Sequence, residues 1–352
     1  MAKGPEKKLA GPAPETRRVT IRDVASAAQV SLGTVSRVLN KHPRVGADAR
    51  IAVEKAIKDL GYVPDAVAQS MRFKSSRAIG CMVSNVANPL FSSIVSSAEM
   101  VANAAGYNMI LANSGDDPRR ESEILSLFQR RRLDGAIMTL SRDTGPEALE
   151  LLSNVSIPIV MLERQVELEE IDSVASDHYR GLKQALDYLR SLNHSRIGLI
   201  TVPPTSFPGR ERLAAYTDHY RSLGLEPDPS MIANTGFTSE YARIAAEKMF
   251  SRSDTPTAIV AGANQIPGVL HAARSHDIEI PGRLSLISIG DSDLAQLYAP
   301  PLTVVRWQPE LVGQLAIETL LDRITAPSKE HQGQHFVQPT ELVVRQSCSP
   351  LS

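Results

Sequence analysis

The stretch VTIRDVASAAQVSLGTVSRVLNKHPRVGADARIAVEKAIKDLGYVPDAVAQSM, residues 19–71, decides how the N-terminal part of the chain folds. Thr20 and Asp23 have the spacing of a capping box, with Asp in place of the usual Glu or Gln, and predict a helix over 21–28. Apolar residues at i, i+3, i+4 and i+7 predict another helix over 47–60. The stretch therefore predicts a small all-α unit.

A further helix between these two has two chemically different faces. Ser31 occupies its N-cap position. Val35, Val38 and Leu39 recur at helical spacing and form an apolar face. The opposite face consists mostly of small or hydrogen-bonding residues, namely Leu32, Gly33, Thr34, Ser36, Arg37 and Asn40. A helix that packs on one side and presents such groups on the other is typical of the recognition helix of a helix-turn-helix, which reads DNA in the major groove.

Three segments, taken in order, resemble the headpiece of the lactose/galactose-repressor (LacI/GalR) family. They are TIRDVA at 20–25, VSLGTVSRVLN at 30–40, and GYVP followed by VAQSM within 61–71. The resemblance implies a helix-turn-helix DNA-binding headpiece over 19–63 and a hinge helix with its linker over 64–77. It also implies a periplasmic-binding-protein-like α/β body, and a homodimer that reads the two halves of a palindromic operator in double-stranded DNA.

The same resemblance suggests which residues contact DNA. Leu32, Gly33 and Arg37 are expected near base edges, although Gly33 offers no side chain and would read bases weakly or indirectly. The hinge helix is expected in the minor groove, where Met71 replaces the leucine that the family wedges between base pairs. Packing of Met71 between hinge and body is the alternative. The expected DNA contacts are Thr20, Ser31, Leu32, Gly33, Thr34, Ser36, Arg37, Asn40, Val67, Ala68, Gln69 and Met71.

Charge is distributed unevenly along the chain. Residues 1–77 carry 15 Lys and Arg against 7 Asp and Glu, whereas the whole chain has a formal net charge of −1. A basic N-terminal segment followed by an acidic remainder is typical of a phosphate-binding headpiece attached to a body that does not bind DNA. The alternative is a chance uneven distribution of charge together with a basic tail. Residues 1–18 lack the apolar core of a secretory signal and are expected to form a disordered basic tail.

Cysteine usage and hydropathy bear on the compartment. The chain contains 2 cysteines, Cys81 and Cys348, which lie far apart and have no metal-ligand spacing. No apolar run approaches the ~20 residues that a membrane-spanning helix requires. These features favour a cytoplasmic protein without a disulfide scaffold, a metal site or a membrane segment.

Beyond residue 77, strand-like and helix-like segments alternate in two runs. The first run extends from a strand at 79–86 to a strand at 157–162, and the second from a helix near Asp177 to a helix at 309–324. Strands of almost wholly apolar residues, alternating with helices, predict parallel sheets covered on both faces. The expected body is therefore α/β, with two Rossmann-like subdomains and a ligand cleft beyond the carboxyl ends of their strands.

The family resemblance also implies that the chain crosses between these subdomains three times. The N-subdomain is expected over about 78–176 and 308–335, and the C-subdomain over about 177–307 and 336–346.

Because α/β bodies host many enzymes, the presence or absence of catalytic motifs bears on function. The sequence contains no G-x-G-x-x-G or G-x-x-x-x-G-K-[ST] phosphate loop, no G-x-S-x-G elbow and no H-E-x-x-H motif. His331 and His335 have i, i+4 spacing but lie in a Gly/Gln-rich segment without an acidic or Cys partner nearby, which favours a surface loop over a metal site. The body is therefore expected to bind a small molecule, with no catalytic residues, metal or cofactor.

Candidate effector contacts follow strand ends. Arg212 matches the family's effector-contacting arginine, and its fork of donors suits hydroxyls or a carboxylate. Phe91 either stacks on a ligand ring or fills the core, and Ser114 either contacts ligand or has a turn or N-cap role. His178 stands where the family's D-N-x-x-G motif has Asn. The expected effector contacts are Asn88, Phe91, Ser114, Asp177, Arg212, Phe237, Asn264, Gln265 and Gly290.

The segment SLISIGD, residues 285–291, departs from the family pattern. The family commonly has two adjacent Asp residues here, the first of which binds sugar hydroxyls. Alignment on Asp291 puts Gly290 in that place. A cleft that lacks this carboxylate but keeps Arg212 is less hostile to anions, so a sugar acid or sugar phosphate is favoured over a neutral sugar as effector.

These features predict a ligand-responsive, sequence-specific transcriptional regulator, most simply a repressor of a carbohydrate or sugar-acid catabolic operon. A sugar-binding transport-type protein shares the body but has no headpiece, and an enzyme on the same body would need catalytic motifs. The identity of the effector, the operator, and whether ligand releases or promotes DNA binding stay open.

Overall fold

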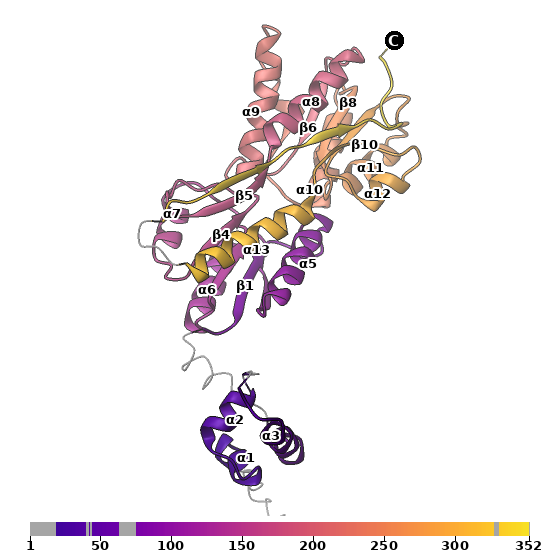
Figure 1. The fold of residues 1–352 in the computed structure, drawn as a ribbon. Coiled ribbons are helices and arrows are strands. Elements are labelled where there is room, and N and C mark those ends of the chain that lie inside the picture. The colour runs from indigo at the N-terminus through magenta and orange to yellow at the C-terminus, as the bar shows by residue number, and fades with distance from the viewer. Residues whose placement is uncertain (1–18, 40–41, 43, 63–74, 327–330, 352) are drawn as a thin grey trace, which may run out of the picture. The chain divides into compact units, whose positions relative to one another are not determined.

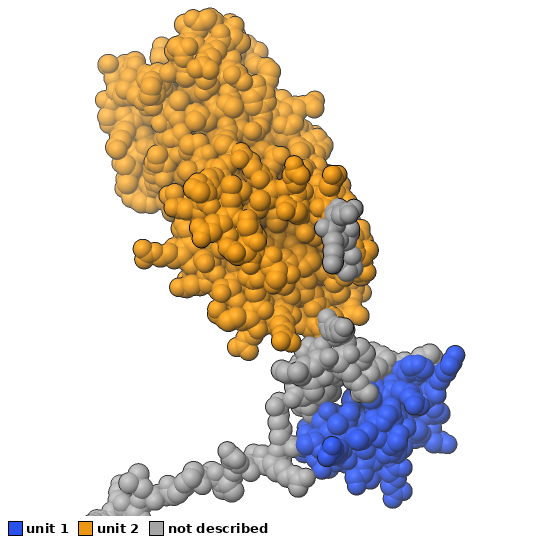
Figure 2. Space-filling view, turned by 90° about the vertical axis from the view of Figure 1, so that its left-hand side faces the viewer, with its two compact units in different colours: residues 1–74 blue, residues 75–352 orange. Residues whose placement is uncertain are grey.

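The computed structural model describes residues 19–39, 42, 44–62, 75–326 and 331–351. The chain divides into two compact units, one within residues 1–74 and the other formed by residues 75–352 (Figure 2). Each unit has hydrophobic core residues of its own.

The first unit is a bundle of short helices. The helices among its described residues are α1 (Ile21–Ala27), α2 (Leu32–Leu39) and α3 (Ala47–Leu60). Val24 of α1, Val35 of α2 and Val53 of α3 are fully buried and meet in one core. Gly61 ends α3 with a φ of +61°, a left-handed conformation that glycine adopts without steric cost. The expected all-α headpiece is present.

The second unit contains two six-stranded sheets (Figure 1). The first sheet has the strand order β11-β5-β4-β3-β1-β2, and all its neighbouring strands are parallel. Its strands are β1 (Ala78–Val83), β2 (Asn108–Asn113), β3 (Gly135–Met138), β4 (Ile159–Leu162), β5 (Asp172–Ser176) and β11 (His335–Gln338). Its helices are α5 (Pro89–Ala104), α6 (Pro118–Arg130), α7 (Pro146–Ser153) and α13 (Pro309–Thr325).

Alternation of side chains along the central strand β1 explains the layers of this subdomain. Ile79, Cys81 and Val83 point into a core shared with α5 and α13. Met82 belongs to the opposite core, with α6 and α7. Gly80 also faces α6, where an added Cβ would lie 2.5 Å from the ring of Phe128. The sheet is therefore covered by helices on both faces, as apolar parallel strands predict.

The second sheet has the order β12-β10-β9-β8-β6-β7 and is parallel except for the β10–β12 pair. Its strands are β6 (Ile197–Ile200), β7 (Ile232–Ala233), β8 (Ala258–Gly262), β9 (Ser285–Ile289), β10 (Thr303–Arg306) and β12 (Glu341–Val343). Its helices are α8 (His178–Ser191), α9 (Phe207–Ser222), α10 (Ser239–Phe250), α11 (Ile266–Ser275) and α12 (Asp293–Leu297), with a 3-10 turn η1 (Pro229–Met231). One core lies against α8 and α9 and the other against α10 and α11.

The chain passes between the subdomains three times. It leaves the first sheet after β5, returns to it with α13, and leaves it again between Gln338 and Glu341, slightly later than the expected crossing near 336. Strand β5 was not predicted from the sequence. All five of its residues, DSVAS, are buried, but three of them are polar and interrupt the apolar run that is typical of a central parallel strand.

Among the described residues, no helix is both long enough and apolar enough to cross a membrane.

Candidate nucleic-acid interface and ligand site

The two faces of α2 differ in burial as the sequence suggested. Val35 and Val38 are buried, with 0% and 6% of their surface exposed. Leu32 is 45% exposed, and Arg37 is exposed as well. Ser31 caps the helix, since its hydroxyl oxygen accepts the backbone N–H of Thr34 at 3.2 Å. The helix therefore presents an apolar and a cationic side chain on the face opposite its core.

The start of α1 also shows the predicted cap. The carboxylate of Asp23 accepts the backbone N–H and the hydroxyl of Thr20, both at 2.8 Å. At Gly33, an added Cβ would lie 3.7 Å or more from the nearest described atoms, so the described part of the headpiece leaves room for a side chain there. Asn40, Val67, Ala68, Gln69 and Met71 lie outside the described residues.

A cavity of about 400 Å³ opens between the two subdomains of the second unit. Its walls come from loops that follow β2 and β3 in one subdomain and β6 and β7 in the other. The lining residues are Asp116, Pro118, Ser141, Arg142, Pro203, Pro204, Thr205, Asn234, Thr235 and Phe237. A cavity at the carboxyl ends of two sets of parallel strands matches the expected position of a ligand cleft.

Arg212 of α9 is buried beside this loop region, with 6% of its surface exposed. One Nη lies 3.4 Å from the hydroxyl oxygen of Thr201, the residue that follows β6, and the other lies 3.3 Å from Nδ1 of His178. Its Nε has no partner among the described residues. Burial lowers the pKa of Arg212 to about 10, against the raising effect of Glu163, so the guanidinium stays charged at neutral pH.

His178 connects Arg212 with a carboxylate of the other subdomain. Its Nε2 lies 2.8 Å from Oε2 of Glu163, which follows β4, and both side chains are only 2% exposed. Because the Arg212 guanidinium donates to Nδ1, the proton of a neutral His178 ring is on Nε2 and is donated to Glu163. Burial lowers the pKa of His178, the Arg212 charge lowers it further, and Glu163 opposes both effects.

Glu163 is held by a second set of donors. Ser176, the last residue of β5, donates its hydroxyl at 2.7 Å and its backbone N–H at 3.2 Å. Burial raises the pKa of Glu163, but hydrogen bonds and charge from His178, together with the Ser176 bonds, bring it below its usual value. Glu163, His178 and Arg212 therefore form a continuous buried chain of polar groups between the subdomains.

Several buried polar atoms near strand ends lack a partner among the described residues. They are the hydroxyl oxygens of Ser114 and Thr139, Oδ1 of Asp116, Nε of Arg212 and Nε1 of Trp307. Native proteins leave few buried polar atoms unsatisfied, because each one costs ~1–3 kcal/mol. Donors and acceptors that come from the carboxyl ends of strands in both sheets are what a polyhydroxylated ligand would satisfy.

Asp143, in the loop after β3, joins the two subdomains directly. Its side chain is fully buried and its carboxylate accepts the backbone N–H of Phe207 at 2.7 Å and Nη1 of Arg210 at 2.5 Å. Its own N–H donates to the carbonyl of Thr205 at 3.1 Å. The loop is therefore fastened to the N-terminus of α9, where an acidic group is favoured by unpaired N–H groups.

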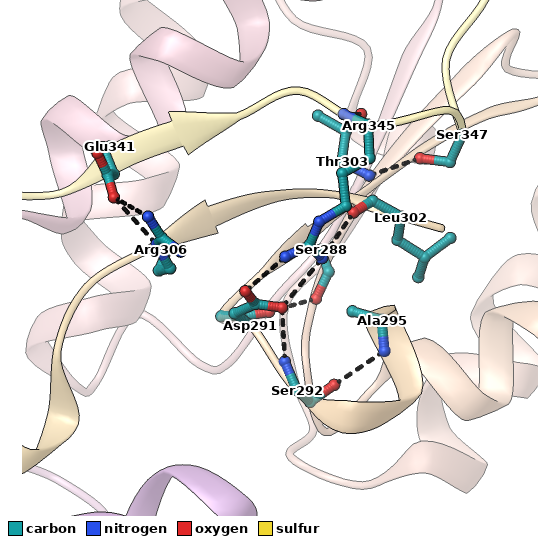
Figure 3. A network of polar contacts seen from close by, with 11 residues as sticks. Ser288, Asp291, Ser292, Ala295, Leu302, Thr303, Arg306, Glu341, Arg345 and Ser347 are labelled. Carbon is teal, nitrogen blue, oxygen red and sulfur yellow. Dashed lines mark hydrogen bonds and ion pairs between the residues drawn. The ribbon is translucent and has the colours of Figure 1, made fainter. Parts of the chain in front are cut away.

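Asp291 does not supply a free carboxylate to the cleft. Arg345 binds it through two N–H···O bonds of 3.0 and 2.6 Å, and the Ser292 N–H adds a third at 3.0 Å (Figure 3). Gly290, where the family places the sugar-binding Asp, has a φ of +106°, and an added Cβ would lie 3.1 Å from that of Ala263. A side chain at position 290 would therefore be strained as well as crowded.

The other expected effector contacts lie in different environments. Phe237 lines the cavity. Asn88 caps α5, since its side chain accepts the N–H of Leu90, and Asp177 caps α8 in the same way through Arg180. Other placements are as follows: Phe91 packs in the core of the first subdomain, Ser114 is fully buried with its hydroxyl unpaired among the described residues, and Asn264 donates to the carbonyl of Phe237.

Gln265 is almost wholly buried and its side chain bonds to the backbone of three separate segments. Its Nε2 donates to the carbonyls of Thr201 and Gly236, and its Oε1 accepts the N–H of Gly262. It therefore ties together the loops after β6 and β7 and the last residue of β8. Among the described residues, no three His, Cys, Asp or Glu side chains are gathered as metal ligands.

Sequence reasoning passed over Asp116, Thr139, Asp143, Glu163 and Trp307. Thr139 and Glu163 come directly after β3 and β4, and Trp307 directly after β10. Their position after an apolar strand was the signal that would have found them.

Comparison with known proteins decides the family. Residues 20–65 match the family described as bacterial regulatory proteins, lacI family, and residues 186–348 match a periplasmic binding protein-like domain. The chain is 30% identical to the HTH-type transcriptional regulator DegA of Bacillus subtilis over 343 residues, covering 95% of this chain and 99% of that protein. It is also 30% identical to the transcriptional repressor PurR of Vibrio atlanticus, with the same coverage. The chain belongs to the lacI family.

Solved structures of lacI-family proteins share its fold. A lac repressor dimer bound to operator and an anti-inducer has a TM-score of 0.81 at 24% identity, over 95% of this chain and 100% of that one. The complex of the regulator CelR with cellobiose has a TM-score of 0.69 at 28% identity, over 94% and 100%. The expected helix-turn-helix headpiece followed by two α/β subdomains is confirmed.

As a lacI-family protein, the chain is a ligand-responsive, DNA-binding transcriptional regulator. The headpiece match rules against the alternative of a sugar-binding transport-type protein without a DNA role. The relatives described above are transcriptional regulators.

Proposed function

We propose that this regulator is a repressor whose affinity for a palindromic operator changes when a small molecule occupies the cleft between its subdomains. The observation that carries the proposal is a set of buried polar atoms that have no partner in the described part of the chain: atoms of residues that follow strands of both sheets, and Nε of Arg212 in α9. A ligand that satisfies donors from both subdomains favours one relative arrangement of them. The cell compartment consistent with DNA binding is the cytoplasm, and we assign no catalytic activity, metal or cofactor to the body.

The ligand class that the cleft supports best is a sugar acid or a sugar phosphate, with a neutral sugar as the second candidate. Arg212 supplies a buried guanidinium whose Nε has no partner among the described residues, and such a group binds carboxylate or phosphate well. Asp291, which would repel an anion, is neutralised by Arg345. Asp116 lines the cavity; burial raises its pKa, and the Arg164 charge and the Ser84 hydrogen bond oppose that shift.

The residues proposed to contact this ligand are Asn88, Phe91, Ser114, Asp177, Arg212, Phe237, Asn264, Gln265 and Gly290, together with Asp116 and Thr139. Three of these have structural duties that limit their contribution: Asn88 and Asp177 as helix caps and Phe91 as a core residue. Arg212 and Phe237 are the strongest members, because one carries an unsatisfied donor within the described structure and the other lines the cavity.

We further propose that the regulator acts as a homodimer. The edge strand β2 leaves Ile110 and Leu111 exposed, and Met100 of α5 is 59% exposed. In the second subdomain Leu297 of α12 is 83% exposed. Apolar side chains on an edge strand and nearby helices favour burial against a second copy. A relative, the lac repressor, has been solved as a dimer on operator DNA.

DNA contacts are proposed at the residues that the sequence indicated: Thr20, Ser31, Leu32, Gly33, Thr34, Ser36, Arg37, Asn40, Val67, Ala68 and Met71. The exposure of Leu32 on the face of α2 opposite the headpiece core supports this assignment. The proposed division is a headpiece over 19–63, a hinge and linker over 64–77 and a body over 78–346.

The proposal is tested by selecting genomic DNA fragments with the purified full-length protein at a stated, near-physiological salt concentration, since phosphate contacts make affinity depend on salt. Recovery of a common palindrome is expected, and recovery of fragments without any shared sequence contradicts operator binding. The recovered duplex is then titrated with D-gluconate, D-galacturonate, D-glucose 6-phosphate, D-glucose and D-ribose. A change in DNA affinity with the acidic compounds is expected; a change with the neutral sugars alone overturns the ligand class.

A further inference from the structure

Four arginines gather at the end of the second unit where the chain enters it from the linker. They are Arg77, Arg130, Arg131 and Arg132, hereafter the arginine cluster. Arg77 directly precedes β1, and the other three end α6 and begin the loop to β3. Figure 1 shows β1 and α6 meeting at this end of the unit.

Asp134 fixes the two arginine-bearing segments to each other. Its carboxylate accepts the backbone N–H groups of Ser76 at 2.7 Å and Arg77 at 3.0 Å, and also the hydroxyls of Ser75 and Ser76. Its own N–H donates to the carbonyl of Ala78 at 2.9 Å. Because these donors occupy both of its oxygens, Asp134 is not available to pair with the cluster.

The cluster is not explained by neighbouring charges or by helix capping. No ion pair among the described residues includes any of its members, although Arg130 donates to the hydroxyl of Ser126 at 3.0 Å and Arg77 lies over the Tyr107 ring. A basic residue in the last turn of a helix complements its dipole, but this accounts for Arg130 only. The cluster also stands out because residues 78–352 carry 23 Lys and Arg against 32 Asp and Glu.

The length of the linker sets a maximum distance between the headpiece and the arginine cluster. The twelve residues 63–74 separate the last described headpiece residue from Ser75. A chain of that length spans at most ~40 Å. A linker of this length allows the cluster to reach a duplex bound by the headpiece, and such a duplex carries one phosphate charge per ~1.7 Å of axis.

We propose that the arginine cluster is a second DNA-contacting surface, which binds the phosphate backbone flanking the operator independently of sequence. This inference rests on the proposed operator binding. Arginine suits the role because its guanidinium donates to phosphate in a fixed fork. Interactions of this kind add affinity and positioning without adding base specificity.

The test uses full-length protein and two duplexes that carry the palindrome recovered by selection. One ends at the outer edges of the palindrome, and the other extends about two helical turns (~20 base pairs) beyond each edge. The variant carries Arg130→Gln, Arg131→Gln and Arg132→Asn, with Asn at the last position because Arg132 has a φ of +54° that Asn tolerates. The dissociation constant is measured over a series of salt concentrations for each protein and duplex.

A matched control carries Arg190→Gln, Arg274→Gln and Arg283→Gln, which removes the same charge from exposed positions elsewhere. Arg190 and Arg274 also lie in last helical turns, so the control reproduces the change in helix capping. Thermal unfolding of all three proteins checks that each one is folded.

On the extended duplex, the cluster variant is expected to bind more weakly than wild type. Its salt slope should be shallower by about 0.9 for each phosphate that the protein no longer neutralises, or about 1.8 if each subunit of a dimer neutralises one phosphate fewer. On the short duplex it should match wild type, and the control should match wild type on both.

Equal salt slopes for the cluster variant and wild type on the extended duplex overturn the inference, as does an equal weakening in the control. A wild-type protein that binds neither duplex overturns the proposed operator binding itself, so the two failures are distinguishable.

Discussion

Nε2 of His178 lies 2.8 Å from Oε2 of Glu163, and this contact joins a residue that opens the second subdomain to one that follows a strand of the first. On its other side His178 accepts a hydrogen bond from Arg212, whose Nε has no partner among the described residues. A ligand that binds Arg212 therefore touches a group connected, through one imidazole, to the opposite subdomain. The family's usual Asn is too short to reach as far as a histidine, so this connection depends on the departure at position 178.

Removing the His178 imidazole should reduce stability. His178→Ala leaves a buried carboxylate with one donor fewer, and a hydrogen bond to a charged group contributes ~1.5–3 kcal/mol. We expect the free energy of unfolding in urea to fall by about 2–3 kcal/mol. The exposed His271, changed to Ala in the same way, should lower it by less than ~0.5 kcal/mol. A His178→Ala protein as stable as the control contradicts a connection through this imidazole.

Stability should also fall on mild acidification. The pKa of His178 is lowered by burial and by Arg212, and burial likewise lowers the pKa values of His194 and His219. The pKa of a histidine in the unfolded chain is 6.5. When the pKa is lower in the folded state, the unfolded state binds more protons at pH values just below 6.5. The contribution of that histidine to folding stability is therefore present above this pH and is lost as the pH falls below it. The free energy of unfolding, measured between pH 7.5 and 5, should decrease, and His178→Asn should flatten that decrease. An unchanged pH profile in the variant would show that His178 is not held neutral.

The Asp143 contact should control the mobility of the start of α9. In Asp143→Ala the N–H of Phe207 and the guanidinium of Arg210 are both deprived of this acceptor. Amide hydrogen exchange at the start of α9 should become faster, and the free energy of unfolding should fall by ~2–3 kcal/mol. Asp228, which caps the short turn η1 at the surface, supplies the control as Asp228→Ala and should leave exchange in α9 unchanged. Unchanged exchange in Asp143→Ala would mean that Asp143 does not fasten the subdomains.

Arg345 should increase the affinity of the cleft for anionic effectors. Arg345→Met releases the Asp291 carboxylate, whose pKa burial raises but Arg345 brings below its usual value. The freed carboxylate should weaken binding of an acidic effector by roughly tenfold, about 1.4 kcal/mol, in isothermal titration. Arg306→Met is the matched control, since Arg306 pairs with Glu341 on the adjacent strand (Figure 3) but has a side chain that is 46% exposed. An exposed pair of that kind contributes ~0–1 kcal/mol, so the control should bind as wild type does. Equal affinities of the two variants for the acidic effector would show that Asp291 does not influence anion binding.

Replacing Arg212 should separate ligand response from DNA binding. In Arg212→Met the effector is without its guanidinium partner, while the headpiece is untouched. The variant should bind the operator as wild type does and show no change when the effector is added, whereas Arg212→Lys should keep a weakened response because a lysine retains charge but not the fork. Operator affinity with and without effector is the measurement. A full response in Arg212→Met would place the effector elsewhere.

The sequence was most informative where chemistry and local spacing coincide. The cap formed by Thr20 and Asp23 and the buried face of α2 could be predicted because each depends on residues within one or two helical turns. Strand β5 could not, because its polar residues are buried through contacts that form only after folding: Asp172 accepts from Arg323 and His331, which are far away in the chain.

The residues of the ligand site also fall into those that could be predicted from the sequence and those that could not. Arg212 and Phe237 were predicted from the resemblance and lie at the cleft or beside it. Glu163 and Asp143 were not, because their importance comes from partners in the other subdomain that sequence spacing does not reveal. The proposal that an anion is bound remains a prediction, to which the Arg345–Asp291 pair adds a physical reason.

The most direct test of the account is a measurement of coupling between the cleft and the headpiece. Operator affinity is measured with and without saturating effector, using the compound of the acidic panel that shifts DNA binding most, and effector affinity is measured with and without saturating operator. Linkage requires both affinities to change by the same factor, expected here to be roughly 5- to 150-fold. An effector that binds the full-length protein tightly but leaves its affinity for the operator unchanged would show that the cleft and the headpiece are not coupled.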